Sequence, residues 1–275
     1  MNDPPTRLLL LVEQELFSHF ELSSADAAEQ SEALEVRLVA LIERKRAETE
    51  ALGTAFDLAL VGSENARMIC GGAYAFPGDS EQYRKLKANR SKAKDLLGAI
   101  VALTPTEFEG FGARVLELLG AQTVHVTRQS NDQGIDFYGV LRLGELIKAP
   151  ESFFHISHKL ELRFAGQAKH YPNSAVGTAV IRELVGSVSL ARFKAFSSEV
   201  DMFEELGLRP FNPLVLLLFT TGSLTKGARE LAERAGILCY SGDQLSAFLA
   251  DNGVGVVSNG CDVQFDESAF KAWLK

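Results

Sequence analysis

The run "PLVLLLFTTG" at residues 213–222 constrains the fold more than any other feature of the sequence. Its consecutive apolar residues, Leu214 to Phe219, do not alternate with polar ones, which is typical of a strand covered on both faces. A helical pattern, the short apolar run 237–240 and another helical pattern follow. Strand, helix, strand, helix in this order predicts parallel neighbouring strands joined by right-handed crossovers.

The preceding segment extends this pattern upstream. "TPTEFEGFGARVLELLG" predicts a helix with Thr104 as N-cap, Pro105 at the first helical position, Glu107 at the third and Gly120 at its end. Two strands are expected in "AQTVHVTRQ" and "GIDFYGVLRL", a third in "LRFAGQAKHY", and a helix in "AVGTAVIRELVGSVSLARF". The sequence therefore predicts an α/β fold with a mixed central sheet flanked by helices.

The first hundred residues have a different pattern. Residues 7–20 and 25–61 repeat apolar residues at helical spacing, and the second segment is rich in Ala, Glu, Arg and Leu and free of proline. A stripe in it, which is either a helical hairpin seam or a dimer contact, comprises Leu34, Leu38, Leu41, Ile42 and Leu52. We expect a helical N-terminal region over 1–100, for targeting or oligomerisation, and an α/β domain over 101–275.

The composition is that of an ordinary globular protein. Of the residues, 46% are hydrophobic and 23% charged, and no apolar run reaches the roughly 18 residues of a membrane span. The N-terminus lacks the basic segment of a signal peptide, so a cytoplasmic location is expected. Three cysteines without CxxC spacing argue against a disulfide framework and against a zinc ribbon.

The formal net charge of -8 gives no global attraction to nucleic acid and counts against a simple sequence-reading DNA-binding domain. Residues 81–94 nevertheless carry a local excess of positive charge, and Glu81 is the sole acidic residue among them. This basic segment is either a solvated helix face or linker, or a strap that contacts DNA phosphates. Its cations are Arg84, Lys85, Lys87, Arg90, Lys92 and Lys94.

Candidate catalytic side chains come from three neighbouring elements. Successive residues of a strand point to opposite faces, so Gln167 and Lys169 share a face. Asp136 stands near the start of the adjoining predicted strand, where its carboxylate can meet them across the ladder. Glu109, in the first predicted helix, can reach the same point. Carboxylate and amide oxygens suit Mg²⁺, and a lysine suits the charge that grows on phosphorus during phosphodiester hydrolysis.

Each residue alone also has an ordinary structural explanation. Asp136 can shape the turn. Gln167 can be a polar residue of an edge strand, and Lys169 can extend its ammonium to water. Glu109 can complement the helix dipole, and Glu183 in "IRELVG" is expected to be a helix-surface acid. The combination, in this order along the chain, favours the catalytic interpretation.

Residues 103–249 resemble the catalytic domain of Mrr-like restriction endonucleases, a branch of the PD-(D/E)xK nuclease superfamily. The matching pieces, in the family's order, are "LTPTEFE", "SNDQGIDFYG", "GQAKHY", "VGTAVIRELVGSV" and "LLLFTTGSLTKGARELAERAGILCYSGDQL". The resemblance implies metal binding by Asp136 and Gln167, a catalytic Lys169, Glu109 as an auxiliary acid, and the Ala168 carbonyl as a further ligand. Two departures are Gln133, where the family usually has Gly, and His170, where a basic residue is usual.

The resemblance implies a Mg²⁺- or Mn²⁺-dependent DNA endonuclease of restriction or phage-defence type. We expect a homodimer or higher homo-oligomer, because cleavage of both strands requires two active sites. Two alternatives remain open. One is a catalytically inactive module that senses nucleic acid or nucleotide on the same fold, which the acidic net charge and the neutral Gln167 favour. The other is a nuclease directed to RNA or single strands.

Overall fold

The computed structural model describes residues 2–54, 57–63, 66–127, 134–146, 157, 159–194, 204–259 and 262–275. The chain forms two compact units. Unit 1 comprises Met1–Leu97 and Asp243–Phe270, and unit 2 comprises Gly98–Gly242 and Lys271–Lys275. The functional division near residue 100 that the sequence suggested stays a prediction. Within the described ranges, no helix is long and apolar enough to cross a membrane.

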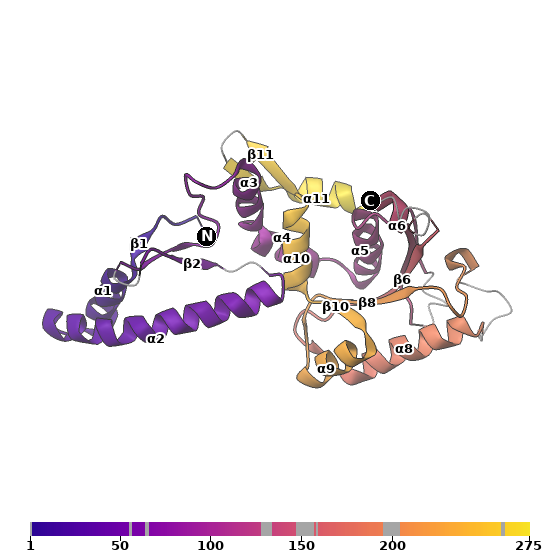
Figure 1. Ribbon diagram of the computed structural model, residues 1–275, viewed down its shortest axis with the longest axis horizontal. Coiled ribbons are helices and arrows are strands. Elements are labelled where there is room, and N and C mark those ends of the chain that lie inside the picture. Colours follow the sequence, from indigo (N-terminus) through magenta and orange to yellow (C-terminus); the bar gives the residue numbers. More distant parts are fainter. Residues whose placement is uncertain are drawn as a thin grey trace. The chain divides into compact units, whose positions relative to one another are not determined.

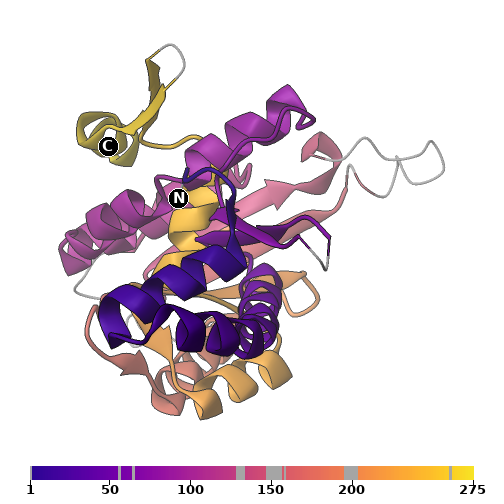
Figure 2. The same ribbon diagram turned by 90° about the vertical axis from the view of Figure 1, so that its left-hand side faces the viewer.

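Unit 1 begins with a helical hairpin and a small sheet. The hairpin consists of α1 (Leu8–Phe20) and α2 (Ser24–Ala51), which lie side by side in Figure 2. The hydroxyl of Ser23 caps α2 by accepting from the Asp26 backbone N–H. The sheet has the antiparallel order β1 (Thr6–Arg7), β3 (Met68–Gly71), β2 (Leu58–Val61).

The core of the hairpin confirms part of the predicted stripe. Leu34 and Leu38 pack against buried residues of α1, together with Leu60 and Ile69 from the small sheet. Leu41 and Leu52 are exposed. The prediction that the helical pattern continues to residue 61 is wrong, because α2 ends at Ala51 and 58–61 form a strand. Gly53, with φ of 68°, adopts a left-handed conformation that ends a helix at little steric cost.

The remainder of unit 1 is mostly helical. Its elements are α3 (Glu81–Arg90), the first part of α4 (Ala93–Val101), most of α10 (Gly242–Asp251), the antiparallel pair β11 (Val256–Asn259) and β12 (Asp262–Phe265), and the first part of α11 (Glu267–Leu274). The guanidinium of Arg90 joins α3 to α10 through two hydrogen bonds to the Asp251 carboxylate, 2.6 and 2.7 Å long. These partners are far apart in sequence, so the bond is a tertiary constraint.

Unit 2 is built on a five-stranded sheet in the order β10, β8, β6, β5, β4. The strand β5 (Phe137–Arg142) lies between β4 (Thr123–Val126) and β6 (Glu161–Lys169) and runs antiparallel to both. The strands β6, β8 (Leu214–Thr220) and β10 (Ile237–Tyr240) are parallel. The prediction of a mixed central sheet, in which the strands that come later in the sequence are parallel neighbours, is confirmed.

One face of this sheet is covered by α5 (Pro105–Leu118), as Figure 1 shows. The helix starts with the predicted capping box between Thr104 and Glu107. The rings of Phe137 and Phe219 stack at 5.1 Å between centroids. A Cβ on Gly112 of α5 or on Gly166 of β6 would lie 2.2–2.3 Å from the Phe137 ring, so both glycines make room for it.

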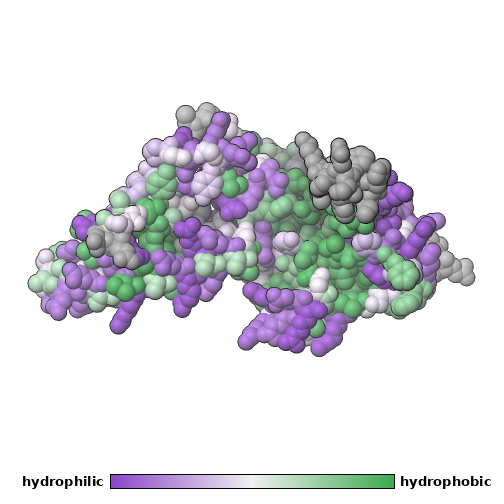
Figure 3. All heavy atoms as spheres, in the orientation of Figure 1, coloured by the Kyte–Doolittle hydropathy of each residue, from purple (hydrophilic) through white to green (hydrophobic). Residues whose placement is uncertain are grey.

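The opposite face is covered by α8 (Thr178–Arg192) and α9 (Lys226–Ala235) (Figure 1). The core on this side contains Tyr138 and Ala165 of the sheet together with Ile181, Leu184 and Val188 of α8. Hydrophilic side chains gather over α9 in Figure 3, which agrees with an outward polar face. Shorter elements of unit 2 are α6 (Leu143–Leu146), the 3-10 turn η1 (Glu204–Leu206), and the parallel pair β7 (Ala175–Val176) and β9 (Ser223–Leu224).

Candidate active site

The candidate site lies at one edge of the unit 2 sheet. Asp136 immediately precedes β5, and Lys169 is the last residue of β6. Because β5 runs antiparallel to β6, the start of one strand and the end of the other meet at the same edge. Thr220, which ends β8, pairs with Lys169 in the parallel ladder and so belongs to the same edge. Polar residues at the ends of three strands therefore lie together at this edge.

Asp136 lies at the end of the ladder between β5 and β6. The last pair of the ladder is Phe137 with Gly166, and the backbone N–H of Asp136 also donates to the Gly166 carbonyl oxygen, at 2.9 Å, so residues 136 and 137 both lie opposite Gly166. The Asp136 side chain is 5% exposed, and its Oδ2 accepts a hydrogen bond of 2.7 Å from the backbone N–H of Ala168. The structure thus brings the aspartate beside the strand that holds Gln167 and Lys169.

Gln167 has an unusual environment for a polar side chain. It is 1% exposed, and neither its Oε1 nor its Nε2 has a hydrogen-bond partner among the described residues. A buried amide without partners costs about 1–3 kcal/mol, so such groups are typically retained for a ligand or a role. The Gln167 amide oxygen, a carboxylate and a backbone carbonyl are all oxygen donors, the kind of ligand that suits Mg²⁺ or Mn²⁺.

Lys169 lies on the same strand face as Gln167 and is half-buried. Its backbone carbonyl accepts from the Thr221 N–H, which fixes the strand end. Over the ranges that the structure describes, its ammonium makes neither an ion pair nor a side-chain hydrogen bond. The Thr221 hydroxyl, also buried and without a hydrogen-bond partner, adds a polar group that sequence reasoning missed. Its position just past an apolar strand end was the available signal.

Gln167 and Lys169 point to the α8 face of the sheet. Ala165 packs in the core below α8, and Gln167 and Lys169 follow it at the strand period of two. A Cβ on Gly134 would lie 3.5 Å from Glu183 Oε1 and 3.6 Å from Gln167 Nε2. Glu183 of α8, expected to be an ordinary helix-surface acid, therefore borders the same space as Gln167.

Glu109 comes from the other face. It is half-buried on α5, whose neighbouring residue Phe108 contacts the ring of His170 at 5.9 Å between centroids. His170 Nε2 lies 3.0 Å from the Val101 carbonyl oxygen, so this imidazole is turned away from the Gln167 face. The assignment of Glu109 as an auxiliary acid stays a prediction. Gln133 lies outside the described residues.

Other kinds of centre find no support in the described parts of the chain. No three His, Cys, Asp or Glu side chains come together there as ligands of one metal ion. Burial raises the pKa of the Cys239 thiol to about 11 and raises that of the Cys70 thiol as well, so both favour the unreactive protonated form. Cys261 lies outside the described residues.

Within unit 1, the structure divides the basic segment into two groups. Lys87 pairs with Asp79 at 2.8 Å, Arg90 with Asp251 and Lys94 with Asp57, the last two at 2.6 Å. The ammonium of Lys87 also lies 4.9 Å from the ring centroid of Phe76 and 4.7 Å from that of Tyr83. Three of the six predicted phosphate contacts therefore have acidic partners within unit 1.

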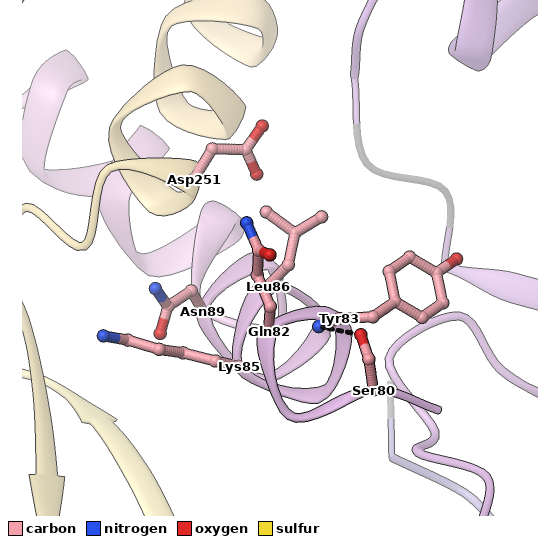
Figure 4. A pocket seen from close by; sticks show the side chains of 7 residues that line it. All are labelled: Ser80, Gln82, Tyr83, Lys85, Leu86, Asn89 and Asp251. Carbon is pink, nitrogen blue, oxygen red and sulfur yellow. Dashed lines mark hydrogen bonds between the residues drawn. The ribbon is translucent and has the colours of Figure 1, made fainter. Parts of the chain in front are cut away.

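The second group forms no ion pair with an acidic residue in the part of the chain that the structure describes. Arg84 donates to the Pro77 carbonyl oxygen, whereas Lys85 and Lys92 form no ion pair with any residue that the structure describes. Figure 4 shows an open pocket beside α3 that is lined mostly by polar side chains. It is lined by Ser80, Gln82, Tyr83, Lys85, Leu86, Asn89 and Asp251. Phosphate binding by the basic segment stays a prediction, carried by fewer cations than the sequence suggested.

Comparison with known families places the site inside a recognised domain. Residues 100–196 match the family model Mrr_cat, described as restriction endonuclease. The match covers about a third of the chain and includes Glu109, Asp136, Gln167, Lys169 and Glu183. The resemblance to Mrr-like restriction endonucleases is confirmed for this segment.

Two solved structures are similar to the chain. The structure titled "MspJI Restriction Endonuclease in Complex with 27-mer Oligonucleotide" has a TM-score of 0.38 and 19% identity, over 66% of this chain and 36% of that one. The structure titled "DNA modification-dependent restriction endonuclease AspBHI" has a TM-score of 0.40 and 16% identity, over 79% of this chain and 59% of that one. The chain thus spans less than two thirds of either. No curated protein matches it.

Proposed function

We propose that this chain, whose residues 100–196 match the restriction endonuclease family, is a metal-dependent DNA endonuclease of restriction or phage-defence type. The single observation that supports this most is the meeting of Asp136, Gln167 and Lys169 at one sheet edge inside the matching segment. In this proposal Asp136, Gln167 and the Ala168 carbonyl hold Mg²⁺ or Mn²⁺, and Glu109 is an auxiliary acid. The partner is DNA, and the assembly is a homodimer or larger.

The chain's own residues supply positioning and charge. Asp136 is fixed at the edge by the Ala168 N–H, so its carboxylate needs no reorganisation when substrate arrives. The ammonium of Lys169, half-buried and without an acidic partner among the described residues, is suited to bind a phosphate oxygen or to orient the attacking water. A bound divalent ion would lower the pKa of a coordinated water and neutralise charge on the phosphate.

Cleavage of supercoiled plasmid tests the proposal. Modified and unmodified plasmid is incubated with the protein and Mg²⁺ or Mn²⁺, with EDTA as the metal-free control. We expect nicked or linear product from the wild type, and a loss of at least about 100-fold for Asp136→Asn and Lys169→Met, since each removes a group that acts in the transition state. Nicking that persists in both variants would contradict the assignment.

The inactive sensing module is the second candidate, supported by the neutral Gln167 and the net charge of -8. It predicts DNA or nucleotide binding by the wild type with no cleavage under any metal condition. The same plasmids, analysed by gel shift as well as by cleavage, separate the two functions.

A further inference from the structure

Gly134 marks a point on which side chains of two elements converge. It has φ of 79°, a backbone conformation that residues other than glycine rarely adopt, and it stands two residues before Asp136. A Cβ placed there would lie 2.7 Å from Ser187 Oγ, 3.5 Å from Glu183 Oε1 and 3.6 Å from Gln167 Nε2. The side chains of two α8 residues and the amide of Gln167 therefore converge on the one position in this loop that has no side chain.

The helix that presents Glu183 is firmly held. Ile181, Leu184 and Val188 of α8 are buried in the core beneath it, so its rotation relative to the sheet is fixed. Glu183 and Ser187 are four residues apart and occupy one face of the helix, where the Ser187 hydroxyl donates to the Glu183 carbonyl oxygen at 2.9 Å. The Glu183 carboxylate is exposed and makes no ion pair with the described residues, which leaves it able to change rotamer.

The buried amide of Gln167 supplies hydrogen-bond donors that suit the Glu183 carboxylate. Its Nε2 is the end that lies 3.6 Å from the Cβ position of Gly134, and this nitrogen has two N–H donors but no acceptor among the described residues. A carboxylate is the strongest acceptor for such donors. Glu183 Oε1 is the acidic oxygen nearest to the Cβ position of Gly134, the point from which this nitrogen also lies 3.6 Å away.

We propose that Glu183 is a positioning residue of the site. Its carboxylate accepts a hydrogen bond from Gln167 Nε2, directly after a rotamer change or through one water. This bond fixes the amide with Nε2 toward α8 and leaves Oε1 as the end that faces a bound cation. The role toward the cation rests on the proposed function, whereas the contact itself does not.

The contact is tested on the metal-free full chain by NMR. The side-chain NH₂ resonances of Gln167 are assigned by their disappearance in Gln167→Leu. We expect Glu183→Gln to shift them and to speed their hydrogen exchange, because a charged acceptor is replaced by a neutral amide. Glu233→Gln, the same change at an exposed position of α9, is the matched control and should leave them unmoved. Resonances that are the same in wild type and in Glu183→Gln would overturn the proposal.

A double-mutant cycle on Mn²⁺ affinity, followed by EPR, tests the positioning role. Glu183→Gln should weaken Mn²⁺ binding by about tenfold, the scale of lost outer-shell partners, with Glu233→Gln unchanged. In the Gln167→Leu background the same change should have little further effect, since Glu183 acts through the amide. Equal losses in both backgrounds would overturn that role. If the wild type binds no Mn²⁺, the proposed function fails, while the NMR result still decides the contact.

Discussion

The carboxylate of Asp136 is tied to the backbone of Ala168, whose N–H donates to Oδ2 across 2.7 Å. Ala168 stands between Gln167 and Lys169, so this one bond fixes the aspartate against the strand segment that bears both other candidate groups. The Asp136 side chain therefore has a structural task, as an acceptor, in addition to the proposed metal-binding task. Substitutions can separate the two.

Asp136→Asn and Asp136→Ala should differ in stability but agree in activity. Asparagine keeps an oxygen that can accept from Ala168, whereas alanine leaves that N–H unpaired, at a cost of about 1–3 kcal/mol in the free energy of unfolding. Both remove the charge that the proposed metal site needs, so both should lose plasmid cleavage. Urea unfolding followed by circular dichroism gives the difference. Equal stability of the two variants would show that the hydrogen bond contributes nothing.

Lys169→Met should abolish cleavage without loss of stability. The ammonium is half-buried and has no acidic partner among the described residues, so an apolar side chain of similar length should leave the free energy of unfolding unchanged or raise it by up to about 1 kcal/mol. Parallel plasmid-cleavage and urea-unfolding measurements check both halves. Lys226→Met, at a highly exposed position of α9, is the control and should alter neither. A destabilised Lys169→Met would indicate a structural role.

Gly134→Ala should destabilise the protein by about 1–3 kcal/mol, because alanine must adopt φ of 79° and its Cβ would lie 2.7 Å from Ser187 Oγ. Adding Ser187→Ala should recover the share of the lost stability that comes from the clash with Ser187. The share that comes from the unfavourable φ at residue 134 should remain. Gly186→Ala is the control: it lies in α8, nothing lies within 4 Å of its Cβ position, and it should stabilise by about 1 kcal/mol. Thermal unfolding ranks the three variants against the wild type. Tolerance of Gly134→Ala would contradict the crowding.

The two groups of cations in the basic segment should respond differently to removal. Lys85→Ala with Lys92→Ala should weaken DNA binding and lower the salt dependence of log K by up to about 0.9 per lost phosphate contact, with an unchanged melting temperature. Lys87→Ala should instead lower the melting temperature, because it removes the partner of Asp79 and the contacts with Phe76 and Tyr83. Gel shifts at several salt concentrations and thermal scans suffice. Unchanged DNA affinity in the double variant would favour a solvated helix face.

The capping box of α5 should make part of the stability dependent on pH. Hydrogen bonds from the Thr104 backbone N–H and hydroxyl hold the pKa of Glu107 below its ordinary value. A folded-state pKa below the unfolded one means stability that is present above the unfolded pKa, near 4.3, and lost as pH falls through the lowered value. Glu107→Gln should flatten this acid limb in urea unfolding between neutral and acidic pH. Thr104→Ala should cost about 1 kcal/mol at neutral pH. An unchanged acid limb in Glu107→Gln would contradict this.

Much of unit 2 follows from local sequence. The capping residues Thr104, Pro105 and Glu107 determine where α5 begins, and the unbroken apolar run determines that β8 is a covered strand. The period of a strand alone puts Gln167 and Lys169 on one face. Each of these properties depends on residues within one or two turns of chain, so a pattern in the sequence is sufficient to predict it.

Other properties were decided by tertiary packing. Leu58–Val61 became a strand because it pairs with Met68–Gly71, and Arg90 was neutralised by Asp251, a residue of a distant helix. Glu183 looked like any acid on a helix surface until the buried face of α8 fixed its rotation against β6 and set it beside Gln167. Sequence periodicity defines the faces of an element, but which face meets which neighbour depends on contacts between distant segments, and these form only when the whole core is packed.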